Sequence, residues 1–391
     1  MHLNELGIIC ALGETAAVIR ERMLELGESG VALTTAYSPG RELPLGKVAA
    51  ELPPADKLPI SARSRNNRLA LAALDQIRPV VDAAVERYGR ERIGVVIGTS
   101  TSGIAEAEAA LRQYSATRSL SKEFRYSQIE LISPAAFLAA VLGTAGPVYV
   151  HSNACASSAT AMASGARLIR MGLCDAVLTG GVDTLCAFTV AGFAALESVS
   201  PSRCNPLSRN RNGINIGEGA ALFLMTNEPA TVAVRGWGES SDGYHISAPD
   251  PSGVGARQAI DRALQRAGIT AEDVDYINLH GTATMQNDAM EARVVYRLFG
   301  GGIPVSSTKP LTGHALGAAG AIEAGLCWLA MQDENPRGKL PPHLWDGVAD
   351  PDLPELNVVN RGDSLGRPLR RALSNSFAFG GANATLLLER E

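Results

Sequence analysis

The chain has 391 residues, of which 46% are hydrophobic and 19% charged, and its formal net charge is −5. This composition indicates a globular protein long enough for two hydrophobic cores, and the negative charge argues against general nucleic-acid binding. Six dispersed cysteines without a CxxC pair favour free thiols in a reducing compartment. The sequence shows no signal peptide and no apolar run long enough to span a bilayer, so we expect a cytoplasmic protein without a membrane span.

The first half of the chain predicts strands that alternate with helices. A strand, a Gly-Thr-Ser-Thr turn and a helix begin at Arg92, and the stretch VYVHSNACASSATAMASGA from Val148 predicts a strand followed by a helix of small residues. Cys155 lies at the turn between this second strand and its helix, where free N–H groups and the helix dipole favour a thiolate. Such small residues predict that another segment packs closely against the helix. A buried structural cysteine is the alternative.

The second half repeats this plan. A strand, a Gly-Thr-Ala-Thr turn and a helix begin at Val274, and IPVSSTKPLTGHALGAAGAIEA from Ile303 again predicts a strand and a small-residue helix. Each half ends in an apolar strand, AALFLM and NATLLLE. The alternation indicates α/β units around a largely parallel sheet, and the long period indicates a duplicated domain. We assign the halves to residues 1–229 and 230–391.

Three reactive side chains follow predicted strands in the two halves: Cys155, His280 and His314. Loops at the carboxyl ends of strands converge in α/β folds, so these residues can meet in one site. Two imidazoles can stabilise two oxyanions, or one can accept a proton, whereas a simple thiol hydrolase has no need of the second. Either histidine can instead be structural. No metal-binding pattern is present.

Two polar pairs accompany the histidines. Lys309 and Glu323 flank His314 in sequence and can balance charge or anchor the following helix, with solvated surface residues as the alternative. Thr282 and Thr284 alternate along an extended turn, so both hydroxyls can line a groove. Helix capping is the alternative for Thr284.

The stretch NSFAFGGANA (375–384) offers a backbone N–H as an oxyanion donor, in addition to that of Cys155. Its aromatic residues, Phe377 and Phe379, can close over a bound chain. A Gly-rich hairpin without a catalytic role is the alternative.

Four motifs, in order along nearly the whole chain, resemble the elongating, Cys-His-His type of β-ketoacyl-[acyl carrier protein] synthase: NACASS, LHGTATMQND, SSTKPLTGHALGAAGAIEA and NSFAFGGAN. The resemblance implies the thiolase fold, in which a duplicated α/β unit forms five αβαβα layers, and a dimer. It also implies an acyltransferase that condenses an acyl thioester with malonyl carrier protein in fatty-acid, polyketide or aryl polyene biosynthesis.

The same resemblance implies a role for each candidate residue. Cys155 would carry the acyl chain, with the N–H groups of Cys155 and Phe379 as the oxyanion hole. His280 and His314 would stabilise the enolate oxygen. Phe377 would act as a gate. Lys309 and Glu323 would support the His314 loop. Thr282 and Thr284 would bind the phosphopantetheine arm.

The resemblance implies an acyl carrier protein as partner and no dissociable cofactor, since the substrates arrive on phosphopantetheine. Carrier proteins of this pathway are acidic, so Arg65, Arg68 and Arg125 are candidate docking residues, with an ordinary solvated helix face as the alternative. Family members pair the strand equivalent to Val148–His151 with a second subunit.

Several positions depart from the usual family pattern. Leu207-Ser208 replaces Phe-Asp, Asn212-Gly213-Ile214 replaces Asp-Gly-Phe, and Asn287 replaces a glycine before Asp288. The segment 134–147 is shorter than usual by about two helical turns. The stretches CDAVLTGGVDTLCAFTVAGF and LPPHLWDG are similar to synthases of aryl polyene biosynthesis. This likeness implies a heterodimer with a Cys-lacking, chain-length-factor-like ketosynthase, and a homodimer is the alternative.

Two other classes of protein remain alternatives. A non-catalytic chain-length subunit would have lost the nucleophile, whereas Cys155 and both histidines are present. A coenzyme A-dependent thiolase would be expected to use a second, C-terminal cysteine as a base, and no cysteine follows Cys327.

Overall fold

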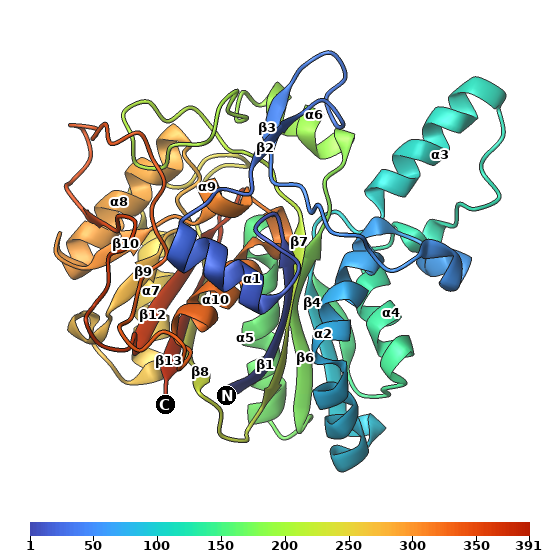
Figure 1. Ribbon diagram of the computed structural model, residues 1–391, viewed down its shortest axis with the longest axis horizontal. Coiled ribbons are helices and arrows are strands. Elements are labelled where there is room, and N and C mark those ends of the chain that lie inside the picture. The colour runs from blue at the N-terminus through green and yellow to red at the C-terminus, as the bar shows by residue number, and fades with distance from the viewer.

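The computed structural model describes residues 1–391 and contains an 11-stranded mixed β-sheet (Figure 1). From edge to edge, its strands are β11 (Asn357–Val358), β10 (Pro304–Ser306), β9 (Tyr276–Asn278), β12 (Arg371–Phe377), β13 (Ala382–Arg390), β8 (Val232–Ser241), β1 (His2–Cys10), β7 (Gly219–Thr226), β6 (Ala176–Asp183), β4 (Ile93–Gly98) and β5 (Val148–His151). The two half-sheets join where His2 of β1 pairs with Ala233 of β8. A separate hairpin is formed by β2 (Ala32–Thr34) and β3 (Leu43–Leu45).

Both half-sheets have the same topology. The first has the order β5-β4-β6-β7-β1 and the second has the order β10-β9-β12-β13-β8. If the five strands of each half are numbered along the chain, both half-sheets have the order 3-2-4-5-1. In each half, the first two neighbouring pairs are parallel and the last two antiparallel. The predicted duplication is therefore confirmed, but a largely parallel sheet is wrong, because the last strand of each half runs opposite to both of its neighbours.

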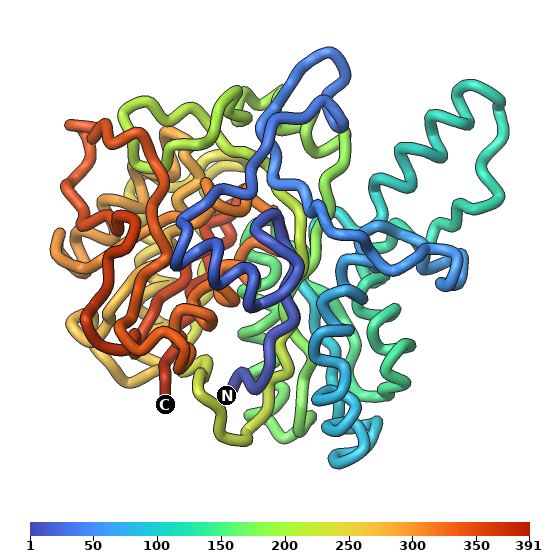
Figure 2. Tube along the Cα trace, in the orientation of Figure 1, coloured from blue at the N-terminus to red at the C-terminus, as the bar shows by residue number.

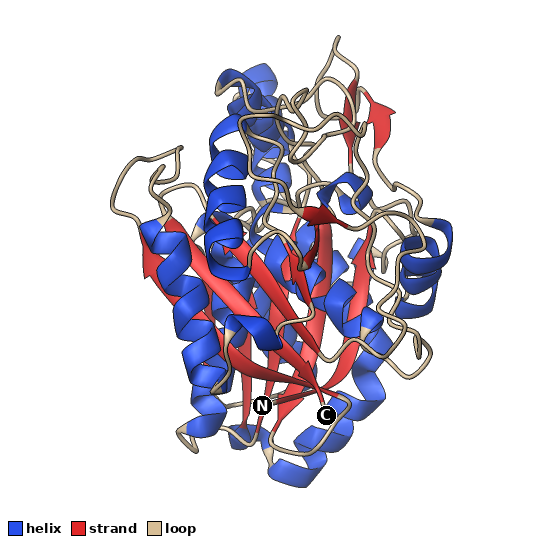
Figure 3. Ribbon diagram, turned by 90° about the vertical axis from the view of Figure 1, so that its left-hand side faces the viewer, coloured by secondary structure: helices blue, strands red, loops and turns tan.

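Helices complete five layers, which follow one another from right to left in Figure 1. The outer face of the first half-sheet packs against α2 (Arg65–Tyr88) and α4 (Ser133–Leu142). Two helices lie between the half-sheets, α5 (Ser157–Arg170) and α10 (Ala319–Ala330). The other outer face packs against α7 (Val254–Ala267) and α8 (Met285–Phe299), so helices cover both sides of the sheets in Figure 3. The predicted αβαβα thiolase arrangement is confirmed.

Shorter elements decorate this core. The remaining helices are α1 (Ala16–Arg20) with its π-helical continuation (Glu21–Leu26), α3 (Ile104–Thr117), α6 (Ala187–Ala195) and α9 (Lys309–Thr312). Single 3₁₀ turns are η2 (Ala55–Lys57), η3 (Ile60–Ala62), η4 (Arg90–Arg92), η5 (Tyr126–Gln128), η6 (Ala154–Ala156), η7 (Ala271–Asp273) and η8 (Leu316–Ala318). The trace in Figure 2 shows α3 and its return segment projecting from the body. None of the helices combines the length and hydrophobicity that a membrane crossing needs.

The small residues of α5 allow the central layer to pack tightly. A Cβ atom added at Gly98 would lie 2.3 Å from the backbone nitrogen of Ser158, and one at Gly181 would lie 2.5 Å from the Cβ of Ser158. On the other side, a Cβ at Gly320 of α10 would lie 3.1 Å from the Cβ of Ala159. Two strands and a helix thus approach the first turn of α5, as its composition predicts.

Candidate active site

Cys155 lies in η6, between the end of β5 and the start of α5. The preceding residue, Ala154, has a φ of +51°, a left-handed conformation that is costly for a residue with a Cβ atom. Ser157 stabilises the turn, because its hydroxyl donates to the carbonyl of Ala154 (2.5 Å) and accepts from the N–H of Asn153 (3.0 Å). The turn directs the Cys155 side chain toward the second half of the molecule.

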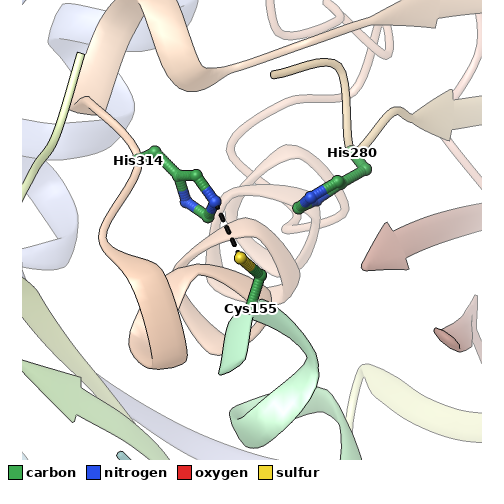
Figure 4. A group of neighbouring side chains, drawn as sticks. All are labelled: Cys155, His280 and His314. Atoms are coloured by element: carbon green, nitrogen blue, oxygen red, sulfur yellow. Dashed lines mark hydrogen bonds between the residues drawn. The ribbon is translucent and has the colours of Figure 1, made fainter. Parts of the chain in front are cut away.

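The two histidines come from the second half and face this thiol (Figure 4). The Nε2 atom of His314 lies 3.1 Å from the Sγ atom of Cys155, and the two imidazole centroids are 5.4 Å apart. His280 follows β9, and His314 lies between α9 and η8, so the ends of three strands contribute to one cluster. The Sγ atom of Cys155 and one ring nitrogen from each histidine all lie within 4.8 Å of one another.

Backbone contacts fix both histidine loops. The N–H groups of His280 and Gly281 donate to the two carboxylate oxygens of Glu291 in α8, at 2.8 and 2.7 Å. The N–H of His314 donates to the carbonyl of Asn215 (2.6 Å), and the carbonyl of His314 accepts from Gly217 (2.8 Å). The imidazoles are therefore pre-positioned by the chain on both sides of the thiol.

Burial sets the protonation states of the cluster. It raises the pKa of Cys155 to about 11, against the opposing effects of the Lys309 ammonium and of the N–H groups of Phe379 and Cys155. Burial, followed by Lys309, lowers the pKa of both His280 and His314 well below the usual histidine value. Burial therefore opposes the thiolate that the helix terminus favours, and it favours the neutral forms of the thiol and of both imidazoles.

Lys309 and Glu323 form a buried ion pair in contact with His280, with side-chain exposed fractions of 2% each. The ammonium donates to Glu323 (2.5 Å) and to the carbonyl of His280 (2.5 Å), and it lies 3.4 Å from Nδ1 of His280. Because an ammonium only donates, Nδ1 accepts and the proton of His280 resides on Nε2, from where it can bond a substrate oxygen. The solvated-surface alternative is wrong, and the direct contact is to His280, not to the ring of His314.

We expect Lys309→Met to lower the free energy of unfolding by about 3–5 kcal/mol, because it leaves the buried Glu323 carboxyl without its partner. The loss should be larger at pH 9 than at pH 6, since burial raises the pKa of Glu323 and the unpaired group is tolerated only while protonated. Denaturant unfolding at both pH values measures this. Lys309→Met combined with Glu323→Leu should recover most of the stability; equal unfolding curves for wild type and the single variant would contradict the account.

A pocket opens onto the cluster. Its lining consists of Cys155, Phe193, Ser198, Ile214, Pro249, His280, Thr282, Thr284, Asn287, His314, Phe377, Ala378 and Phe379. The hydroxyls of Thr282 and Thr284 lie 2.9 Å apart along it. Thr284 occupies the N-cap position of α8, but its side chain makes no capping hydrogen bond, so the capping alternative is wrong.

The stretch 375–384 is the hairpin that joins β12 and β13, and it also lines the pocket. Gly380 and Gly381 have φ angles of +83° and +78°, which let the chain turn directly after Phe379. The Phe379 ring lies 5.7 Å from that of Phe193, and the Phe377 ring lies 6.2 Å from that of His280. The stretch is therefore a Gly-rich hairpin that also lines the pocket.

The candidate docking arginines differ in how free their side chains are. Arg65 donates twice to the buried Glu218, and Arg68 donates to the backbone carbonyls of Pro53 and Leu52. These guanidinium groups are committed within the chain, which argues against a docking role. Arg125 is exposed, and its guanidinium group donates to the carbonyls of Lys122 and Phe124 in its own loop.

Models of the β-ketoacyl synthase N-terminal and C-terminal domains match residues 60–230 and 231–344. The chain belongs to the β-ketoacyl synthase family. It is a β-ketoacyl-[acyl carrier protein] synthase with the thiolase fold, and therefore an acyltransferase. Neither a chain-length subunit nor a thiolase describes it better.

The synthase is similar to proteins of several pathways. It is 33% identical to nodulation protein E of Rhizobium sp. (strain N33), over 98% of this chain and 97% of the relative. It is 31% identical to 3-oxoacyl-[acyl-carrier-protein] synthase 2 of Staphylococcus aureus (strain COL), over 86% and 84% of the two chains. A ketosynthase solved in complex with its chain length factor, ApeO with ApeC from Xenorhabdus doucetiae, superposes with a TM-score of 0.93 at 46% identity, over 100% of this chain and 98% of that chain.

Several residues in and around the pocket are not identified as site residues by any pattern in the sequence. Phe193 lines the pocket from α6, and Ser198, Ile214 and Pro249 line it from segments outside the helices and named strands, where no periodicity indicates which side chains face inward. Glu291 carries one weak signal, a carboxylate on a helix that follows the His280 loop. Burial raises its pKa to about 7, opposed by the N–H groups that it accepts.

Proposed function

We propose that Cys155, His280 and His314 perform a decarboxylative Claisen condensation. The observation that carries the proposal is the 3.1 Å contact between Nε2 of His314 and Sγ of Cys155, with His280 on the other side of the same pocket. The thiol proton passes to the imidazole as sulfur attacks the acyl thioester, and the carrier thiol leaves with a proton. The N–H groups of Cys155 and Phe379 stabilise the tetrahedral oxyanion.

In the second half-reaction, malonyl carrier protein loses carbon dioxide, and the electron pair of the broken C–C bond forms an enolate. Nε2–H of His280, held in that tautomer by Lys309, donates to the enolate oxygen, and His314 donates to it in the tautomer that carries its proton on Nε2. The carbanion attacks the Cys155 thioester and the C–S bond breaks, which releases the 3-ketoacyl carrier product and the Cys155 thiolate. The thiolate then takes a proton from water. Thr282 and Thr284 bond the phosphopantetheine arm, while Phe377 and Phe379 act as the gate.

No dissociable cofactor is needed in this cycle, because the thiol is the nucleophile and carbon dioxide loss provides the carbanion. We assign the reaction to the cytoplasm and the two halves to residues 1–229 and 230–391. Incubation with acyl carrier protein, followed by peptide mass spectrometry, tests the first half-reaction. The acyl mass should lie on the peptide containing Cys155, and an adduct confined to another cysteine would overturn the assignment.

We also propose aryl polyene biosynthesis as the pathway and a chain-length-factor-like ketosynthase as the second subunit. The 46% identity to a ketosynthase solved in complex with its chain length factor supports both. The outer edge of β5 is unpaired and its four residues are half-buried, so this strand can pair with the second subunit. Purification with and without the neighbouring genes, then elongation of saturated and polyunsaturated primers, tests the proposal; equal elongation of saturated primers by a stable homodimer would overturn it.

Carrier docking should depend on Arg125. Arg125→Glu is expected to raise KM for carrier-bound substrate roughly threefold to tenfold without changing kcat, because the carrier is acidic. The effect should shrink at high salt. Arg297→Glu, at an exposed position of α8, is the matched control and should leave KM unchanged. Equal KM values for the Arg125 variant and wild type would remove this residue from the docking surface.

A further inference from the structure

Asp183, at the end of β6, is a fully buried carboxylate outside the pocket lining, with an exposed fraction of 0%. Its Oδ1 atom accepts from the hydroxyls of Thr99 and Thr101 and from the N–H groups of Ser100 and Thr101, each at 2.8 Å. Its Oδ2 atom accepts from the Ser100 hydroxyl (2.5 Å). No cation pairs with it, so hydrogen bonds alone compensate the buried charge.

One further bond connects Asp183 to the other half of the chain. The N–H of Gly317, in η8, donates to Oδ2 at 2.6 Å. Gly317 lies three residues after His314, and a Cβ atom there would lie only 2.7 Å from Oδ2, so the contact requires glycine. Two residues before Asp183, a Cβ at Gly181 would lie 2.5 Å from Ser158 and 3.1 Å from Ala318. The end of β6 thus touches the turns that follow both Cys155 and His314.

We propose that Asp183 is a positioning residue, which holds the His314 loop of the second half at hydrogen-bond distance from Cys155 of the first half. The Asn215 and Gly217 contacts fix the chain at His314 itself, and the Asp183–Gly317 bond fixes it three residues later. This inference rests on the proposed function of His314. It assigns a role in the condensation to a residue that contacts neither substrate nor the reacting atoms.

Asp183→Asn tests the proposal with little change in volume. The amide oxygen can retain the four donors at the Oδ1 position, whereas the NH₂ group faces the N–H of Gly317, so that bond is lost. Condensation kcat should fall at least tenfold with KM for carrier substrates unchanged. Alkylation of Cys155 by iodoacetamide should shift to higher pH, because the imidazole no longer lies close enough to accept the thiol proton.

A double-variant cycle separates positioning from a general effect on the fold. In the His314→Ala background, Asp183→Asn should cause no further loss of condensation. Thr99→Val is the matched control: it removes one bond to Asp183 but keeps the Gly317 contact, so its alkylation profile should match wild type even if the melting temperature falls.

Two results would overturn the inference: the same loss from Asp183→Asn with and without His314, or an unshifted alkylation profile. Wild-type condensation by His314→Ala alone would instead overturn the proposed function of His314. The two failures are therefore distinguishable.

Discussion

Cys155→Ala should abolish acyl transfer and condensation, yet leave decarboxylation of malonyl carrier protein measurable. The proposed nucleophile comes from the first half of the chain, while both imidazoles that we propose as enolate stabilisers come from the second half and remain in place. Intact-mass spectrometry should detect no acyl adduct, and labelled malonyl substrate should still release carbon dioxide.

Cys174→Ala is the control for this prediction. Cys174 is also buried, but it lies beyond the C-terminal end of α5, whereas Cys155 precedes the N-terminal end. Its loss should therefore leave both half-reactions at wild-type rates. A covalent acyl group on another cysteine of the Cys155→Ala variant would show that the nucleophile is misassigned.

His280→Ala and His314→Ala should each retain some acylation of Cys155 but reduce condensation by about a hundredfold to a thousandfold, the usual effect of removing one oxyanion donor. Both side chains are buried beside the thiol, and their lowered pKa values keep the imidazoles neutral at physiological pH. Separate assays of acyl-enzyme formation and of 3-ketoacyl product test the two steps independently.

A histidine remote from the pocket provides the control. His2, on β1, accepts a hydrogen bond from the N–H of Ala230 and should tolerate replacement by alanine without loss of condensation. Wild-type rates of elongation by both the His280 and His314 variants would refute the two-histidine mechanism.

The sequence predicts the parts of the fold and site that depend on local pattern. Alternating strands and helices, repeated with matching Gly-Thr turns, predict the duplicated α/β plan, and the positions of Cys155, His280 and His314 after strands predict one convergent site. Small residues in α5 predict its tight packing. Each of these features is recognised from short local motifs, even where two such motifs lie far apart in the chain.

Features that depend on distant contacts could not be predicted in this way. The charges of Arg65 and Arg68 are visible in the sequence, but their partners, Glu218 and backbone carbonyls, come from other segments. The helix terminus at Cys155 favours a thiolate, yet burial raises the pKa of the thiol to about 11. Asp183 appears only as the last residue of an apolar strand, and its bond to Gly317 joins positions 134 residues apart.

Single-turnover product analysis tests the central claim most directly, namely that one thiol and two imidazoles from the two halves form a condensing site. The wild-type enzyme, loaded with an acyl group at Cys155, is mixed with malonyl carrier protein, and the carrier-bound products are identified by mass spectrometry. The account predicts a 3-ketoacyl carrier product longer by one CH₂–CO unit, with one carbon dioxide released per product. Release of the free acid from Cys155, without elongation, would contradict it.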